Sequence, residues 1–86
     1  MHVMITGLVQ GVGFRYFVLR RAQAFGVTGW ARNLFTGEVE VVAQGDKASL
    51  EHLLREVRIG PRSAQVTDVK VAWDDTEERF NSFEIR

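Results

Sequence analysis

The chain has 86 residues, the length of a single domain, and its lack of cysteine excludes disulfides, thiolate metal sites and cysteine nucleophiles. Its formal net charge is zero, but residues 1–33 contain four arginines and no acidic residue, whereas residues 34–86 contain seven basic and eleven acidic residues. This division into +4 and −4 indicates a local anion site and argues against a surface that binds polyanions. The alternative is chance clustering in a short segment.

The first part of the chain predicts a strand, a helix and a second strand. Residues 2–9 alternate in the manner of a strand. Residues 14–25 change to helical spacing, and Gly26 is a suitable residue to end that helix. Residues 27–32 predict the next strand. The apolar stripe of the helix consists of Phe14, Phe17, Val18, Ala22 and Phe25.

A hairpin and a second helix follow. Residues 33–37 predict the hairpin connection, and residues 38–44 predict a strand that faces Val39, Val41 and Ala43 inward. Asp46 is a suitable N-cap, and Gly60-Pro61 stops the helix that it begins. The buried stripe of this helix consists of Leu50, Leu53, Leu54 and Val57.

The last part predicts one long strand and one short one. Residues 64–73 predict the fourth strand, with a slip in alternation at residues 67–68 that suggests a bulge, and residues 82–85 predict a short closing strand. The order β-α-β-β-α-β is the split βαβ pattern, so we expect one domain over residues 1–86 with an α+β, ferredoxin-like fold. We expect an antiparallel sheet in which the first and third strands are neighbours, with both helices on one face.

The segment between the first strand and the first helix is the strongest candidate for chemistry. Residues 10–15 read Gln-Gly-Val-Gly-Phe-Arg, so two glycines precede a helix N-terminus, where free N–H groups and the helix dipole favour an anion. Arg15 in the first turn opposes that dipole, and a bound dianion would resolve the conflict. The alternative is a tight turn with a solvated arginine. Neither the Walker A pattern nor the dinucleotide fingerprint is present.

Other polar residues carry weaker signals. Asn33, at the end of the second strand, could hold a water, or it could be an ordinary turn asparagine. His2 and His52 have no partner at metal-ligand spacing, so we expect solvated histidines and no metal site. The acidic residues Asp74, Asp75, Glu77 and Glu78 predict a solvated loop.

A nucleic-acid partner is not indicated, although RNA-recognition motifs share this element order. Those domains place aromatic and basic residues on the third strand. Here the third strand begins Glu-Val-Glu-Val-Val at residue 38, which is acidic and has no aromatic residue.

The whole chain resembles the acylphosphatase family. Residues 9–15, Val-Gln-Gly-Val-Gly-Phe-Arg, are similar to its phosphate-binding signature, and residues 29–33, Gly-Trp-Ala-Arg-Asn, are similar to its second signature. Residues 37–40 and 60–64 also match in order and spacing. Ala31 departs from a frequent valine, and residues 34–37 differ from many relatives, which leaves fine substrate preference open.

The resemblance implies hydrolysis of acyl phosphates without a cofactor. It implies that the phosphoryl group is bound by Arg15 and by the loop amides of Gln10, Gly11, Val12, Gly13, Phe14 and Arg15. It implies that Asn33 positions the attacking water. Two alternatives stay open: a non-catalytic anion-binding module on the same fold, and a piece of a larger carbamoyl-phosphate-processing enzyme.

The cell compartment and assembly state follow from weaker signals. No apolar run approaches the roughly 20 residues that cross a bilayer, and the N-terminus does not resemble a signal peptide. The absence of cysteine fits a reducing compartment. The chain ends directly after the last predicted strand, which favours a stand-alone protein. We therefore expect a cytoplasmic monomer without a membrane partner.

Overall fold

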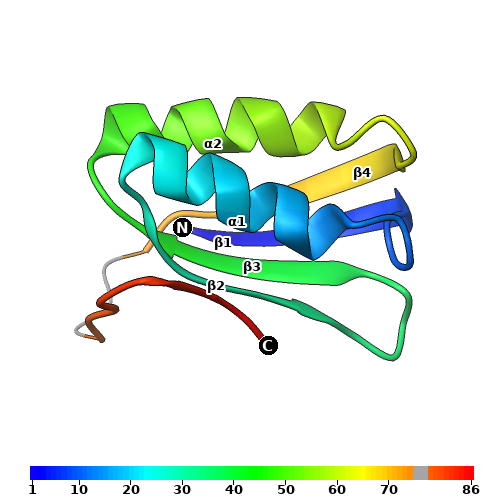
Figure 1. Ribbon diagram of the computed structural model, residues 1–86, viewed down its shortest axis with the longest axis horizontal. Helices are drawn as coiled ribbons and strands as arrows, with labels where there is room; N and C mark the ends of the chain where they lie inside the picture. Colours follow the sequence, from blue (N-terminus) through cyan, green and yellow to red (C-terminus); the bar gives the residue numbers. More distant parts are fainter. Residues whose placement is uncertain (75–77) are drawn as a thin grey trace.

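Two helices cover one face of a five-stranded sheet in the computed structural model, which describes residues 1–74 and 78–86 (Figure 1). The helices are α1 (Phe14–Phe25) and α2 (Lys47–Ile59), which pack against each other. The strands are β1 (His2–Leu8), β2 (Thr28–Asn33), β3 (Val39–Gln44), β4 (Gln65–Ala72) and β5 (Phe83–Ile85). This arrangement confirms the predicted ferredoxin-like α+β class.

The strands follow the order β4-β1-β3-β2-β5 across the sheet. β1 pairs antiparallel with β3 and β4, and β2 pairs antiparallel with β3, so the predicted neighbours β1 and β3 are confirmed. β5 pairs parallel with β2, with Ala31 opposite Ile85, so this short strand makes the sheet as a whole mixed. The parallel pair places Ile85 close to the end of β2.

The predicted bulge in the fourth strand is also confirmed. Thr6 lies opposite Asp68 and Gly7 lies opposite Val66, so Thr67 is the extra residue between them. Two residues on one strand against one on its partner are the definition of a bulge, and they bend the pair locally.

The ends of the helices agree with the sequence pattern. Helix α1 has the predicted bounds, and the N–H of Gly26 faces the carbonyls of Ala22 and Gln23. Asp46 caps α2, because its Oδ1 accepts the N–H of Ser49 at 3.0 Å. Hydrogen bonds from Ser49 lower the pKa of Asp46 below its usual range.

The strand ends differ from the prediction by one residue in most cases. The hairpin connection was expected to begin at residue 33, but Asn33 is the last residue of β2 and pairs with Val39, which agrees with its expected place at the end of the second strand. Glu38 was expected to begin the third strand, which starts one residue later. Pairing with a neighbouring strand decides where a strand ends, and the sequence of one segment does not contain that information.

The core lies between the sheet and the two helices. The inward residues of β3, Val39, Val41 and Ala43, are fully buried as predicted. Helix α2 contributes Leu50, Leu53 and Val57 to the core, whereas Leu54 packs only partly against it. Each fully buried Val, Leu or Phe side chain stabilises the fold by roughly 1.5–3 kcal/mol.

The predicted acidic loop is described only in part. Asp74 and Glu78 are exposed, and Asp75 and Glu77 lie outside the described residues.

Candidate active site

The loop between β1 and α1 lines one cavity with two glycines and the start of a helix. Gly11 and Gly13 have φ angles of 74° and 77°, a left-handed conformation that is unfavourable for other residues by roughly 1–2 kcal/mol. Gly13 is the N-cap of α1 and provides no side-chain cap, and Phe17 N donates to its carbonyl oxygen at 3.0 Å. The amides of the first turn, residues 14–16, therefore have no carbonyl acceptor within the helix. Such amides favour an anion.

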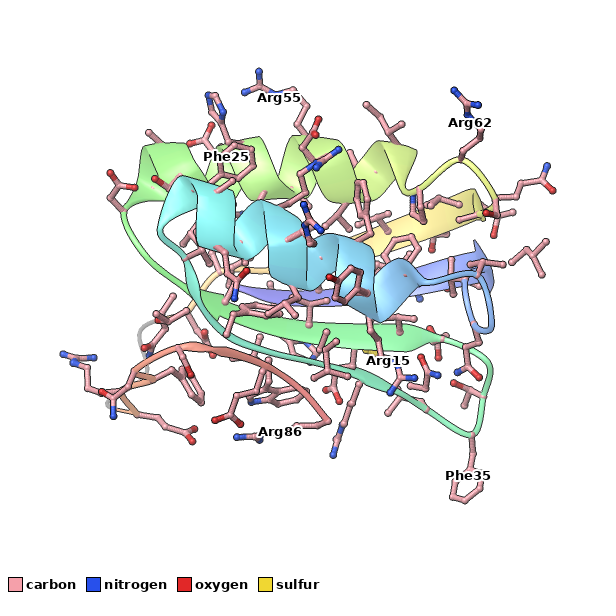
Figure 2. The ribbon with its side chains drawn as sticks, in the orientation of Figure 1. Arg15, Phe25, Phe35, Arg55, Arg62 and Arg86 are labelled. Carbon is pink, nitrogen blue, oxygen red and sulfur yellow. The ribbon has the colours of Figure 1, made fainter. Side chains whose placement is uncertain are left out.

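Arg15 adds a full positive charge at the same place. It lies in the first turn of α1, which contains no acidic residue, and its Nη1 donates to the backbone oxygen of Arg86 at 3.1 Å. Figure 2 shows its side chain leaving the start of α1 toward the strands. Within residues 1–74 and 78–86, Arg15 forms no ion pair with an Asp or Glu side chain. No Asp or Glu side chain in that part of the chain therefore neutralises its charge.

Asn33 supplies a polar group without a protein partner. Its Oδ1 is buried, and it is the one buried side-chain oxygen or nitrogen in the described part of the chain that has no hydrogen-bond partner. A buried acceptor left unpaired is unfavourable by about 1–3 kcal/mol. An atom of this kind in a native structure indicates a ligand or a bound water.

Arg15 and Asn33 both line a cavity of about 150 Å³. Since a water occupies about 30 Å³ in the liquid, the cavity has room for a small oxyanion together with a water. Its walls are Val9, Gly11, Gly13, Phe14, Arg15, Tyr16, Asn33 and Ile85.

Most of the residues selected from the sequence line this cavity, and two do not. Gln10 and Val12 are absent from its walls, and the side chain of Gln10 bonds to the hairpin that follows β2. Sequence reasoning did not include Val9, Tyr16 and Ile85 among the site residues. The position of Tyr16 beside Arg15 in the first turn was an available signal, whereas Ile85 reaches the site only through the parallel pairing of β5 with β2.

The neighbouring Arg32 is occupied elsewhere. Its Nε donates to Glu40 Oε1 at 2.6 Å, and its guanidinium carbon lies 5.1 Å from the centre of the Trp30 ring. His2 Nε2 lies 2.6 Å from the other Glu40 oxygen. Burial raises the pKa of Glu40, but the hydrogen bonds and charges of these two partners outweigh it and leave the pKa below its usual range. Arg15 is therefore the arginine that serves the cavity.

A larger hollow of about 920 Å³ lies at the opposite end of the sheet. It is bordered by the end of α1 at Gly26 and the start of α2 at Lys47, and the Lys47 Nζ lies 5.7 Å from the centre of the Trp73 ring. The loop that contains Gly11 and Gly13 does not line it, and among the described residues its walls contain no buried side-chain amide without a hydrogen-bond partner. The smaller cavity is the better candidate for chemistry.

The described residues contain neither a metal-ligand cluster nor a helix that could span a membrane. Residues 1–74 and 78–86 contain no group of three or more His, Asp or Glu side chains that could hold a metal ion. None of the helices in the same part of the chain is long and apolar enough to cross a membrane.

Known proteins are similar to this chain over almost its full length. The family model named Acylphosphatase matches residues 1–85. An acylphosphatase of Chlorobaculum tepidum is 49% identical over 84 residues, which cover 98% of this chain and 91% of that protein. The crystal structure of acylphosphatase from Bacillus subtilis has a TM-score of 0.96 at 35% identity and covers 99% of this chain and 94% of its own.

The same fold also occurs within a longer protein. HypF from T. kodakarensis matches with a TM-score of 0.88 at 26% identity, over 99% of this chain but only 11% of that one. The family match, the sequence identity and the agreement of the structures lead to one conclusion: this chain belongs to the acylphosphatase family and is a hydrolase of acyl phosphates.

Proposed function

We propose that the cavity holds the phosphoryl group with Arg15 and the amides of residues 10–15, while Asn33 positions a water for in-line attack on phosphorus. The partnerless Oδ1 of Asn33, in the same cavity as Arg15, is the observation that carries this proposal. The oxygen can accept a hydrogen bond from a water and so orient a lone pair of that water toward the phosphorus.

Hydrolysis of an acyl phosphate needs few further catalytic groups from the protein. Phosphoryl transfer passes through a loose transition state, in which positioning and charge stabilisation supply most of the catalysis. The guanidinium and the helix amides can neutralise the equatorial oxygens, and Asn33 can align the nucleophile. The carboxylate of an acyl phosphate is a good leaving group, so strong acid catalysis is not needed.

The proposal includes hydrolysis without a metal and without a phosphoenzyme. The attacking water gives its proton to the phosphate or carboxylate of the substrate, the P–O bond to the carboxylate breaks, and inorganic phosphate leaves. Isolation of a phosphorylated side chain during turnover would contradict this step.

The test is hydrolysis of acetyl phosphate or benzoyl phosphate, with and without EDTA. We expect EDTA-insensitive turnover, with kcat lowered by about 10²–10³ in Arg15→Ala, because one charge-stabilising donor is lost. Asn33→Ala should mainly lower kcat, since water positioning acts on the reacting atoms more than on substrate binding. A change in KM alone would make Asn33 a substrate ligand.

A folded wild type that binds phosphate at Arg15 without turnover would support an anion-binding module instead. The cytoplasmic location and the monomeric state stay predictions, and size-exclusion chromatography tests the second.

A further inference from the structure

The side chain of Gln10 connects the phosphate loop to the hairpin between β2 and β3. Its Nε2 donates to the carbonyl oxygen of Leu34 at 2.7 Å and to that of Glu38 at 2.9 Å, and the residue is partly buried. An amide nitrogen carries two hydrogens, so both donors of Gln10 are used in this contact.

The two accepting carbonyls close the hairpin. Leu34 N donates to the Glu38 oxygen at 2.9 Å, and Gly37 N donates to the Leu34 oxygen at 3.1 Å. Each carbonyl has two lone pairs, so it can accept both its hairpin bond and the bond from Gln10. The amide therefore joins a hairpin that is already closed, and the hairpin's own bonds remain when the amide is removed.

The sheet itself does not make this connection. β3 lies between β1 and β2, and the pairing of β1 with β3 ends at Ile5 opposite Val39. The loop that follows β1 and the end of β2 are thus not joined by ladder hydrogen bonds. A second contact, from Thr6 Oγ1 to Glu38 Oε2 at 3.2 Å, is exposed and involves only side chains.

We propose that Gln10 is a positioning residue, which fixes the distance between the phosphate loop and Asn33. This inference rests on the proposed function. Leu34, whose carbonyl accepts the shorter bond, directly follows Asn33 in the chain. Gln10 is the first residue of the phosphate loop, residues 10–15, and it precedes Gly11. Its side-chain amide therefore links the start of this loop to Leu34, the residue after Asn33.

The consequence for kinetics is specific. Of the groups that we propose bind the phosphoryl group, Arg15 and the amides of residues 14 and 15 belong to α1 and not to the part of the loop that Gln10 ties to the hairpin, so most of the binding should persist without Gln10. The water on Asn33 would lose its alignment, and a displacement of 1 Å can lower the rate by about 100-fold. We expect Gln10→Leu, which removes the amide and leaves an apolar side chain of comparable size, to lower kcat for acetyl phosphate by about 10- to 100-fold. KM and the inhibition constant of inorganic phosphate should stay within about threefold of wild type.

The matched control is Gln44→Leu. Gln44 ends β3 at the opposite end of the sheet, where its Nε2 donates to the Glu78 carbonyl and its Oε1 accepts the Phe80 N–H. Gln44→Leu removes the same kind of amide bridge at the end of the sheet opposite the cavity, so kcat and KM should remain those of wild type. Far-UV circular dichroism and tryptophan fluorescence confirm that both variants are folded, and Gln10→Ala replaces Gln10→Leu if the latter does not fold.

A double variant tests whether Gln10 acts through Asn33. If it does, Gln10→Leu combined with Asn33→Ala should be no slower than Asn33→Ala alone, because the aligned water is already lost. Fully multiplicative effects would overturn the proposal, as would an unchanged kcat in Gln10→Leu or a KM that rises in proportion to the loss of rate. If Asn33→Ala retained full activity, the proposed function would fail, whatever the effect of Gln10→Leu.

Discussion

Replacing Gly29 with alanine tests how closely β2 packs against β3, in the strand that ends at Asn33. Gly29 pairs with Ala43 of β3 and has a φ angle of 139°. Its N–H donates to Ser82 and that of Ala43 donates to Met1, so the two residues exchange no hydrogen bond with each other. Such pairs are the closely spaced ones of an antiparallel ladder, with Cα atoms about 4.5 Å apart. A Cβ on Gly29 would lie 1.9 Å from the carbonyl oxygen of Val42.

The size of the effect follows from this geometry. Contacts of a Cβ under 3.0 Å are essentially never found, so the strands must separate by about 1.1 Å at this point. The flanking pairs, Thr28 with Gln44 and Trp30 with Val42, are the hydrogen-bonded ones and would be stretched. Loss of two such bonds at about 0.5–1.5 kcal/mol each, added to about 1–3 kcal/mol for a positive φ, gives a destabilisation of roughly 2–6 kcal/mol.

Thermal or urea unfolding, followed by tryptophan fluorescence, measures this loss. For a domain of this size, each 1 kcal/mol lowers Tm by about 4–8 °C, so Gly29→Ala should lower Tm by at least about 8 °C. The control is Gly37→Ala, because Gly37 has a φ angle of 94° and open space where its Cβ would lie. Gly37→Ala should lose only the contribution of the positive φ angle, about 1–3 kcal/mol. Equal losses in the two variants would refute the steric argument.

Three further changes test the packing and the charges. Glu40→Gln should lower the free energy of unfolding most above pH 4.5, and the difference from wild type should shrink as the pH falls. The reason is that a carboxyl whose pKa is lowered in the folded state stabilises the fold only while it is ionised. Urea unfolding at several pH values measures this difference, and a difference that does not change with pH would contradict the prediction. Leu53 is fully buried, and Leu53→Ala should destabilise the protein by about 2.7–5 kcal/mol in the same assay; a loss below about 1 kcal/mol would mean that the site collapses around the smaller residue. Arg21 and Glu56 form a 2.8 Å ion pair with side chains 43% and 34% exposed, so a double-mutant cycle should give a coupling below about 1 kcal/mol that weakens with salt; a larger, salt-independent value would indicate a desolvated pair.

Local signals in the sequence predicted most of the fold. The first helix has the predicted bounds because a glycine stands directly before it and another directly after it, and because its apolar residues follow one stripe. The N-cap Asp46 was recognisable for the same reason, since capping depends on residues three positions apart. The parallel pairing of β5 was not predicted, because three residues at an edge carry no signal for which strand they join or in which direction.

For the candidate site too, the sequence predicted the part that one continuous segment forms and missed the parts that depend on strand pairing. Residues 10–15 form a continuous motif whose glycines and arginine conflict with ordinary helix rules, so they were identified from the chain alone. That Asn33 shares a cavity with Arg15 depends on side-chain rotamers and on the strand order, which places β3 between β2, the strand of Asn33, and β1, the strand that precedes the helix of Arg15. The contribution of Ile85 depends on the pairing of β5 and was invisible in the sequence.

Two local conflicts of this protein lie at one cavity. Arg15 stands at the positive end of a helix dipole, and Asn33 buries an oxygen that has no partner among the described residues. At the other end of the sheet, Asp46 caps its helix and Gln44 bonds with both atoms of its amide, so the same kinds of group are satisfied there. A phosphoryl group with a water would satisfy both features together, since the phosphoryl group brings negative charge to the arginine and amides, and the water donates a hydrogen bond to the asparagine. The two conflicts together therefore support the cavity as the catalytic site more strongly than either residue does alone.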